Sequence, residues 1–563
     1  MSTQSRNTET RSARVRDGAT LSARNVDKSF GPHQVLHDVS LLLAPGRKVG
    51  IVAANGTGKS TLLRLLAATD LPDRGNIERA PHTATVGYLE QEPDRRPDET
   101  VEGFLRRRTG IADAIEAFEV AAVELGEGVD GADNRYSDAL DRFLALGAAE
   151  FEARVGEVCA EVGLDSALLA VPMTVLSGGQ AARASLASVL LSRFDVLLLD
   201  EPTNDLDFAG LEMLERFVQQ LPAGVAIVSH DRAFLERTIN AVLEIDDHSH
   251  TAKEYGGGWL AYLEERATAR RHEQEAYSTY SDQRSALLGR AQRERQWATQ
   301  GVNKVKKSGE TDKYIKAFKT ASSEQLAGKA KRTEQMIDRL EAVEKPWEGW
   351  DLQFEILAAS RAGAVTARLD SAVVRLGDFK LGPVSLEIST GERVAITGEN
   401  GSGKTTLLGA ILGTHALHSG SRHLGPGVVL GTLAQSRSRF GAATLLEGFV
   451  EETGLLINEA RALLAKFSLT TEHVMRPATS LSPGERTRGE LALLMARGVN
   501  CIVLDEPTNH LDLVAIEQLE QAMESFAGTV IVVSHDRRLL ESLSLTRRIE
   551  LDDGDVVSDT PTD

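Results

Sequence analysis

Short apolar runs that end in glycine-rich turns recur in both halves of the chain. Residues 48–52 and 393–397 are strand-sized apolar runs, and each continues into a turn and then a helix that begins near Lys59 or Lys404. Such an apolar run bounded by turn residues is typical of a buried strand. The pattern therefore predicts two α/β domains, each with a phosphate-binding loop between its strand and its helix.

A second pair of apolar runs ends in acidic residues. Residues 196–199 and 502–504 are apolar, and each run is followed by Asp-Glu. The acids are Asp200 and Glu201 in the first half and Asp505 and Glu506 in the second. A buried strand capped by a helix-starting acid is the alternative, but it does not explain why the pair is Asp-Glu in both halves. We expect the first acid of each pair to help bind Mg²⁺ and the second to orient a water molecule.

Two further segments have a helical pattern. Residues 111–151 are predicted to form an acidic helical hairpin, the arm. Residues 259–347 are charged and poor in Pro and Gly, with Leu326, Ala330, Ile337 and Leu340 at helical spacings. They predict an antiparallel coiled coil whose two arms of about 35–40 residues flank a tip at 299–311.

These motifs form one long internal repeat. Lys59 and Lys404 are 345 positions apart, whereas Asp200 and Asp505 are 305 positions apart. Gln91 and Gln435 are 344 positions apart, so the register shifts by 39 residues after Gln91, and this insertion contains the arm. An ordered repeat of several motifs indicates two tandem nucleotide-binding cassettes.

Composition limits the class of protein. The 563 residues suffice for several domains, the two cysteines form no metal or disulfide pattern, and no apolar stretch reaches the ~20 residues needed to span a bilayer. Residues 1–20 are polar and lack the apolar core of a secretory signal, which predicts a disordered tail and a cytoplasmic protein.

The charge is unevenly distributed. The net charge is −19, but residues 285–333 contain 12 basic and four acidic residues, a local charge of +8. With Trp297, Tyr314 and Phe318 interleaved, this segment suits binding to structured RNA. A solvated helical spacer whose charge has no function is the alternative.

The glycine-rich turns read AANGTGKST at 53–61 and GENGSGKTT at 398–406. Their backbone N–H groups, at a helix N-terminus, are suited to binding the phosphates of ATP. A glycine turn that binds nothing is the alternative for either loop alone. The predicted ATP-binding residues are Asn55, Gly56, Gly58, Lys59, Ser60 and Thr61, and Gly398, Asn400, Gly401, Gly403, Lys404, Thr405 and Thr406.

Residues 176–180, LSGGQ, resemble the signature motif of ATP-binding-cassette ATPases, and residues 481–485, LSPGE, resemble its variant. The resemblance implies that the signature of each cassette closes over ATP held by the loop of the other. It implies signature contacts from Ser177, Gly178, Gly179, Gln180, Ser482, Gly484 and Glu485. It also implies catalytic residues Glu201, Glu506, His230 and His535, and D-loop acids Asp207 and Asp512. Mg²⁺ ligands would come from Ser60, Gln91, Asp200, Thr405, Gln435 and Asp505, and Phe30 would stack on adenine.

The chain departs from that pattern at several positions. Ala53 replaces the usual first glycine, Asp205 stands where the second half has His510, and no aromatic of the second half aligns without a gap to Phe30. Pro483 lacks the N–H that Gly179 has. These differences predict two sites of unequal chemistry.

The tandem cassettes, the arm and the charged linker resemble the ABC-F family of translation factors and antibiotic-resistance ATPases, from about residue 21 to 557. The run EKPWEGW at 344–350 is most similar to actinobacterial resistance proteins. The resemblance implies a monomer that binds the ribosomal exit site in its ATP-bound state. Its linker tip, with Lys304, Lys306 and Lys307, would point at ribosomal RNA and the P-site tRNA and displace antibiotics.

Three alternatives remain open: a housekeeping translation factor, the ATPase subunit of a drug exporter, and a DNA-maintenance ATPase. The exporter subunit is disfavoured because the chain has no membrane span and already contains both cassettes. The DNA-maintenance ATPase is disfavoured because the hairpin is short and the sequence lacks zinc ligands. The expected organisation is a tail at 1–20, a first cassette at 21–257, a linker at 258–348, a second cassette at 349–557 and a tail at 558–563.

Overall fold

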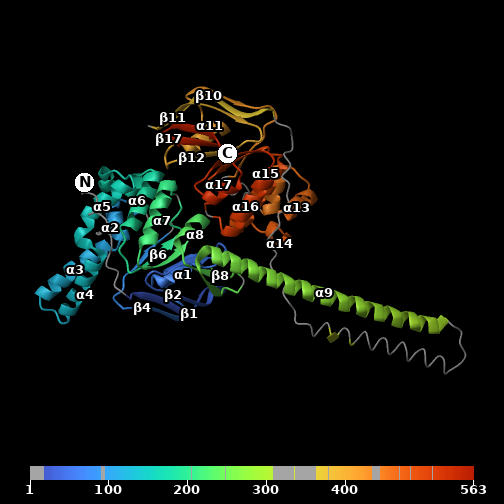
Figure 1. Ribbon diagram of the computed structural model, residues 1–563, viewed down its shortest axis with the longest axis horizontal. Coiled ribbons are helices and arrows are strands. Elements are labelled where there is room, and N and C mark those ends of the chain that lie inside the picture. The colour runs from blue at the N-terminus through green and yellow to red at the C-terminus, as the bar shows by residue number, and fades with distance from the viewer. Residues whose placement is uncertain are drawn as a thin grey trace, which may run out of the picture. The chain divides into compact units, whose positions relative to one another are not determined.

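The computed structural model describes residues 18–90, 96–204, 206–247, 249–307, 332, 335–336, 363–377, 379–433, 444–467, 469–481, 483–509 and 511–562. The chain divides into two compact units. One contains residues 1–259 and 352–563, and the other contains residues 260–351. The first unit holds both cassettes (Figure 1).

The first cassette contains two sheets. A three-stranded antiparallel sheet has the order β2-β1-β4, and a six-stranded sheet has the order β5-β6-β7-β3-β8-β9. The strands are β1 (Thr20–Phe30), β2 (His33–Leu43), β3 (Lys48–Val52), β4 (Arg74–Ala80), β5 (Val86–Leu89), β6 (Val196–Asp200), β7 (Gly224–Val228), β8 (Ala241–Ile245) and β9 (Ala252–Gly256). Only β9 runs antiparallel to its neighbour in the larger sheet.

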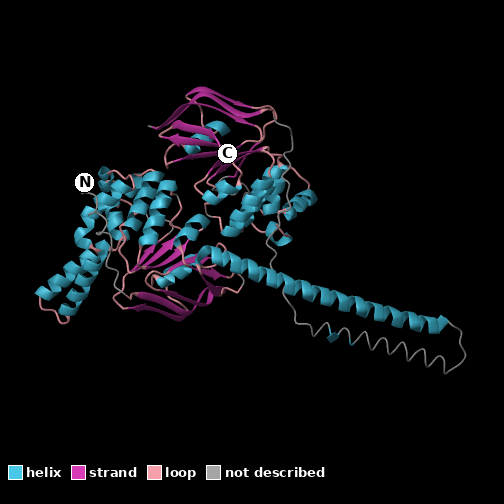
Figure 2. Cartoon of the chain, in the orientation of Figure 1, coloured by secondary structure: helices cyan, strands magenta, loops and turns pink. Residues whose placement is uncertain are grey.

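Helices cover this sheet (Figure 2). The helices of this cassette are α1 (Lys59–Leu66), α2 (Val101–Arg108), α3 (Ile111–Gly126), α4 (Ala132–Leu146), α5 (Phe151–Glu161), α6 (Gly178–Leu190), α7 (Phe208–Gln220) and α8 (Arg232–Thr238). Short 3₁₀ turns are η1 (Ala148–Glu150), η2 (Ser166–Ala170) and η3 (Met173–Val175). Strands β3, β6 and β7 are apolar and almost fully buried, as expected for a parallel sheet covered on both faces.

The second cassette repeats this arrangement, with sheet orders β11-β10-β13 and β14-β15-β16-β12-β17-β18. Its strands are β10 (Val365–Leu376), β11 (Phe379–Ser389), β12 (Arg393–Gly398), β13 (Ser419–Leu424), β14 (Leu430–Leu433), β15 (Cys501–Asp505), β16 (Thr529–Val533), β17 (Arg547–Asp552) and β18 (Asp555–Pro561). Its helices are α11 (Lys404–Leu412), α12 (Leu445–Thr453), α13 (Ile457–Lys466), α14 (Thr471–Val474), α15 (Pro483–Ala496), α16 (Leu513–Ser525) and α17 (Arg537–Ser542), with the turn η4 (Ala478–Ser480).

The predicted arm is a helical hairpin. Helices α3 and α4 lie side by side (Figure 1), and Phe118 of α3 packs its ring against Tyr136 and Phe143 of α4 at centroid distances of 5.3 and 5.1 Å. Gly131 and Gly147 bound α4 with positive φ angles of 72° and 68°, which a residue with a Cβ adopts only with strain. The predicted arm is therefore a packed pair of helices that stays in contact with α2 of its cassette.

The second unit is described chiefly through helix α9 (Gly258–Lys307), which has 50 residues. The helix is longer than the predicted 35–40 residues, and it continues through the first part of the predicted tip, so placing the break at Thr299 was wrong. At ~1.5 Å per residue, 50 residues give a helix of about 75 Å. The rest of the predicted tip, the basic and aromatic positions after Lys307, and all but three residues of the predicted returning arm lie outside the described residues.

Two predicted boundaries also change. The first cassette begins at β1, one residue before the predicted start. Residues 558–561 of the predicted C-terminal tail at 558–563 are instead part of β18, which pairs with β17 as far as Pro561. A polar sequence at an edge strand has little signal apart from its partner, which explains why this strand was missed.

Candidate functional site

Parallel strands bring the motifs of each cassette together. In the first cassette β3 lies between β7 and β8, and β6 pairs with β7. The glycine loop follows β3, Asp200 ends β6, and His230 follows β7. Because the carboxyl ends of parallel strands meet at one edge of a sheet, these three motifs converge there. The second cassette has the same arrangement on β12, β15 and β16.

The two loop lysines lie over their own loops. The Lys59 ammonium donates to the carbonyl of Ala53 at 3.0 Å, to that of Ala54 at 3.3 Å and to Asn55 Oδ1 at 3.2 Å. The Lys404 ammonium donates to the carbonyls of Gly398 and Glu399, both at 2.8 Å. Burial lowers the pKa of both lysines, opposed mainly by Glu201 and Glu506 respectively.

Ala53 and Gly398 are tolerated for different reasons. Gly398 has a φ of 146°, and a Cβ there would lie 2.2 Å from the carbonyl oxygen of Leu551. Ala53 is nearly buried and still offers its carbonyl to Lys59. The departure from the motif at Ala53 therefore leaves the loop geometry intact, whereas the second loop needs its glycine.

The strand-end aspartates are buried beside loop hydroxyls. Burial raises the pKa of Asp200, and hydrogen bonds from Ser60 and Tyr88 oppose that rise. Burial likewise raises the pKa of Asp505, opposed by a hydrogen bond from Thr405. Asp200 Oδ1 is buried without a hydrogen-bond partner among the described residues. A buried carboxylate oxygen beside a hydroxyl suits a hard cation such as Mg²⁺, so these residues fit the predicted metal.

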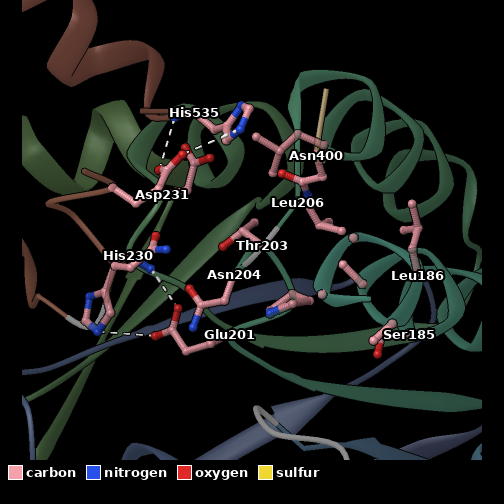
Figure 3. Close-up of a pocket in the computed structure, with 18 of the residues that line it drawn as sticks. Ser185, Leu186, Glu201, Thr203, Asn204, Leu206, His230, Asp231, Asn400 and His535 are labelled. Carbon is pink, nitrogen blue, oxygen red and sulfur yellow. Dashed lines mark hydrogen bonds and ion pairs between the residues drawn. The ribbon is translucent and has the colours of Figure 1, made fainter. Parts of the chain in front are cut away.

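Each strand-end aspartate is followed by a glutamate whose backbone has a strained conformation. Glu201 and Glu506 have φ angles of 49° and 44°, which are rare for residues other than glycine. His230 contacts Glu201 twice: its Nε2 is 3.2 Å from Oε1, and its backbone N–H donates to Oε2 at 3.3 Å (Figure 3). His535 repeats the pair with Glu506, with Nε2 3.5 Å from Oε1 and the backbone donating at 3.3 Å.

The electrostatics of these groups suit proton transfer near neutral pH. Burial raises the pKa of Glu201 to about 7, a rise opposed by Lys59. Burial, with Lys404 nearby, lowers the pKa of His535 to about 4, so this imidazole is neutral at pH 7. A carboxyl poised near the working pH is what a general base requires.

The cassettes contact each other reciprocally at the loops. The backbone N–H of Asn55 donates to Asp512 Oδ2, and that of Asn400 donates to Asp207 Oδ2, both at 3.2 Å. The other oxygen of each aspartate caps its own helix, accepting from Gly210 and Ala515 at 2.9 Å. Each D-loop acid therefore joins one cassette's helix to the other cassette's phosphate loop.

The first signature motif lies against the second loop. Ser177 and Gln180 form a reciprocal capping box at the start of α6, with bonds of 3.3 and 3.0 Å. A Cβ on Gly179 would lie 3.2 Å from the Asn400 side chain, so only a very small residue fits.

The second signature begins differently. Pro483 is the first residue of α15, where its missing N–H would have had no helical partner. Glu485 pairs with Arg476 at 3.0 Å and with His473 at 3.3 Å. The two signature helices are therefore anchored by different contacts.

Two cavities occupy this region. One, of about 360 Å³, is lined by the first loop from Asn55 to Thr61 and by Asp200, Glu201 and His230. The other, of about 520 Å³, is lined by both cassettes, including Gly178 and Gly179 of the first and Asn400, Glu506 and His535 of the second (Figure 3). Both volumes are of the size that binds small ligands.

Sequence reasoning missed two side chains. The Tyr88 hydroxyl donates to Asp200 Oδ2 at 3.2 Å, and in the second cassette the same strand position holds Thr432. Tyr88 lies three residues before Gln91, and that proximity was the available signal. Phe379 begins β11, paired with Leu376, and a Cβ on Gly403 would lie 2.7 Å from its ring.

The aromatic residues beside the turns of the two corresponding hairpins lie on different strands. Phe30 ends β1, is half exposed and lies 5.3 Å from the Lys28 ammonium. Phe379 is on the opposite side of the corresponding hairpin, so the second cassette does have an aromatic there, which an ungapped alignment with Phe30 could not find. Gln91, Gln435, Ser482, Asp205 and His510 lie outside the described residues.

Comparison with known proteins agrees with this geometry. The ABC transporter family profile matches residues 36–204 and 381–509. The chain is 34% identical over 543 residues to the tylosin resistance ATP-binding protein TlrC of Streptomyces fradiae, covering 93% of this chain and 96% of that protein. It is 31% identical over 532 residues to the energy-dependent translational throttle protein EttA of Mycobacterium tuberculosis, covering 92% and 89%.

A plant protein, ABC transporter F family member 2 of Arabidopsis thaliana, is 30% identical, covering 94% of this chain and 76% of its own. The fold is also that of an archaeal ribosome recycling factor, aABCE1, solved in complex with the stalk protein aP1. That match has a TM-score of 0.57 and 18% identity, over 96% of this chain and 90% of the other. The chain belongs to the ABC transporter family of ATP-binding-cassette proteins and, within it, to the ABC-F group. Among the described helices none has a long enough apolar stretch to cross a membrane.

Proposed function

We propose that this protein is an ATPase that uses ATP to bind the ribosome and protects it from antibiotics at the peptidyl-transferase centre or exit tunnel. ATP with Mg²⁺ would bind at two composite sites, each made from the loop of one cassette and the signature of the other. Hydrolysis would separate the cassettes and release the protein.

Each group of site residues has a separate role in ATP hydrolysis. Backbone N–H groups of the two loops, with Lys59 and Lys404, hold the phosphates. Ser60 with Asp200, and Thr405 with Asp505, would hold Mg²⁺, which would neutralise negative charge on the phosphates. Glu201 and Glu506 orient and deprotonate the attacking water, while His230 and His535 fix the carboxylates.

The reciprocal bonds from Asn55 to Asp512 and from Asn400 to Asp207 carry the proposal. They join each phosphate loop to the opposite cassette, so a nucleotide held there contacts both. A ligand that contacts both faces only in the closed pair favours that pair by its differential affinity.

Two observations support the ribosome as the binding partner: the names of the relatives and the charge of the linker. TlrC is named as a tylosin resistance protein, and EttA is named as a translational throttle protein. The basic segment at 285–333 supplies cations for ribosomal RNA and the P-site tRNA, and the closed state would bind at the exit site.

A pelleting assay with the full chain tests this function. E201Q/E506Q with ATP is expected to sediment with 70S ribosomes and to block protein synthesis, because closed cassettes cannot reopen. The wild-type chain with ADP is the control. Free E201Q/E506Q in the supernatant at saturating ATP would refute the proposal.

A housekeeping translation factor is the second candidate, favoured by the similarity to EttA. The two differ in their effect on drug sensitivity. Expression in a sensitive bacterium should raise the minimum inhibitory concentration of an antibiotic of the peptidyl-transferase centre or tunnel only if the protein protects ribosomes. The substitution pair K306A/K307A should lower that protection without changing ATP binding.

A further inference from the structure

Two ion pairs join the cassettes away from the phosphates, and they are related by the same repeat as the motifs. Arg537 of the second cassette donates to Glu215 of the first at 3.0 Å, and Arg232 of the first pairs with Glu520 of the second. Arg232 and Arg537 are 305 positions apart, and so are Glu215 and Glu520. The two pairs are thus the same contact, exchanged between cassettes.

Both pairs are withdrawn from solvent. The exposed fractions of the side chains are 19% for Arg537 and 9% for Glu215, and 16% for Arg232 and 15% for Glu520. A buried ion pair is costly to break from one side, because the remaining charge stays desolvated. Glu215 also pairs with Arg237 of its own cassette at 3.0 Å, so this cost falls mainly on the Arg232–Glu520 pair. These contacts therefore differ from ordinary surface ion pairs, which contribute little.

Each pair begins two residues after a switch histidine, which is the histidine that contacts the catalytic glutamate of the same cassette. Arg537 follows His535 and is the first residue of α17, and Arg232 follows His230 and is the first residue of α8. The acid of each pair lies on the opposite cassette's D-loop helix: Glu215 on α7 and Glu520 on α16.

Helix α7 therefore contacts the second cassette at two points. Its capping residue Asp207 accepts the N–H of Asn400 in the phosphate loop, and its Glu215 holds Arg537 beside the switch histidine. Phe208 at its first turn packs edge-on against the His535 ring at a centroid distance of 5.1 Å, and Arg537 lies 5.8 Å from the Phe208 ring. Helix α16 makes the matching contacts with Asn55 and Arg232.

We propose that the exchanged pairs Arg232–Glu520 and Arg537–Glu215 are positioning pairs that align the switch histidine of each ATP site from the opposite cassette. The inference rests on the proposed ATPase function. Each histidine would then lie within contact distance of its catalytic glutamate only when the D-loop helix of the other cassette packs against it.

The unmatched contacts provide a control. Arg538 pairs with Glu236 across the same interface, but the repeat position of Arg538 is Ala233, so the contact occurs once. Its side chains are more exposed, at 41% and 30%. Loss of this pair should weaken the interface without acting on either histidine.

Single-turnover hydrolysis of ATP by the full chain tests the inference site by site. The background E506Q leaves only the first site competent, and E201Q leaves only the second. R232M should slow the first site about tenfold, with the second changed less than about threefold and the KM for ATP within about twofold. R537M should show the reverse pattern, and R538M should change neither rate.

Because R232M could disturb folding, the isosteric variant E520Q and the double variant R232M/E520Q complete the cycle. The double variant should be no slower than R232M, since no charge is then left unpaired. Equal slowing of both sites, a change in KM alone, or a lowered melting temperature with unchanged rates would overturn the inference. A chain that hydrolyses no ATP in any background would refute the proposed function itself. Hydrolysis that R232M and E520Q leave unchanged would refute only the positioning role.

Discussion

The two ATP sites share one design but differ in how each holds its catalytic groups. At the first, Tyr88 bonds the strand-end aspartate, and His230 lies 3.2 Å from Glu201. At the second, Thr432 takes the place of the tyrosine, His535 lies 3.5 Å from Glu506, and Phe208 of the other cassette packs on that histidine. Both sites have the exchanged contacts across the interface, but the first has an additional hydrogen bond from its own cassette, and the second has an additional ring contact from the other cassette.

The largest expected effect comes from the catalytic glutamates. E201Q and E506Q should each lower single-turnover hydrolysis at their own site by about 100-fold or more, because a neutral amide cannot accept the proton. We expect E201Q to remove more of the total steady-state rate, since Glu201 is held more closely. Radiolabelled phosphate release measures both. A greater loss with E506Q would reverse the ranking of the sites.

Next in size is the loss of a D-loop acid. D207N and D512N keep the oxygen that caps the helix but present an amide N–H to the partner loop's N–H. We expect about a tenfold drop in hydrolysis at the second site for D207N and at the first for D512N. Asp165 caps the 3₁₀ turn η2 within the first cassette, so D165N is the matched control. Equal loss at both sites from either variant would contradict a reciprocal arrangement.

The pH dependence of the first site should follow Glu201. With its pKa raised to about 7, the base is protonated below that pH. Hydrolysis by E506Q should therefore fall by about tenfold for each pH unit below 7 and level off above it. A single-turnover profile from pH 5.5 to 9 measures this. A flat profile over that range would show that Glu201 does not limit the rate.

The smallest effect concerns Tyr88. Y88F removes one hydrogen bond to Asp200, and we expect a loss of about threefold to tenfold at the first site, with a higher Mg²⁺ requirement. The matched change T432V in the second cassette should have less effect. Titration of Mg²⁺ in the E506Q and E201Q backgrounds compares them. An unaltered Mg²⁺ dependence in Y88F would mean that the phenol does not position the aspartate.

The fold and the single-cassette motifs could be predicted because their signals are local. Apolar runs, glycine turns and Asp-Glu pairs each occupy a few consecutive residues. The two matching sets of sheets and the two family matches confirm the tandem cassettes that these signals predict. The roles of individual site residues stay predictions. The contact between Arg232 and Glu520 joins positions 288 residues apart and has no local pattern, so it required the structure. Phe379 was missed because it stands after the hairpin turn, at the position that corresponds to His33, whereas Phe30 stands before the turn.

The left-handed backbone of Glu201 and Glu506 has a consequence for how the protein tolerates change. A side chain in that conformation costs about 1–2 kcal/mol relative to glycine, so the fold alone would favour glycine at both strand ends. The chain instead keeps a carboxylate at each. Glycine at either position should raise the melting temperature of the cassette and abolish ATP hydrolysis at that site. Stability and activity therefore make opposite demands on the residue at this one backbone position.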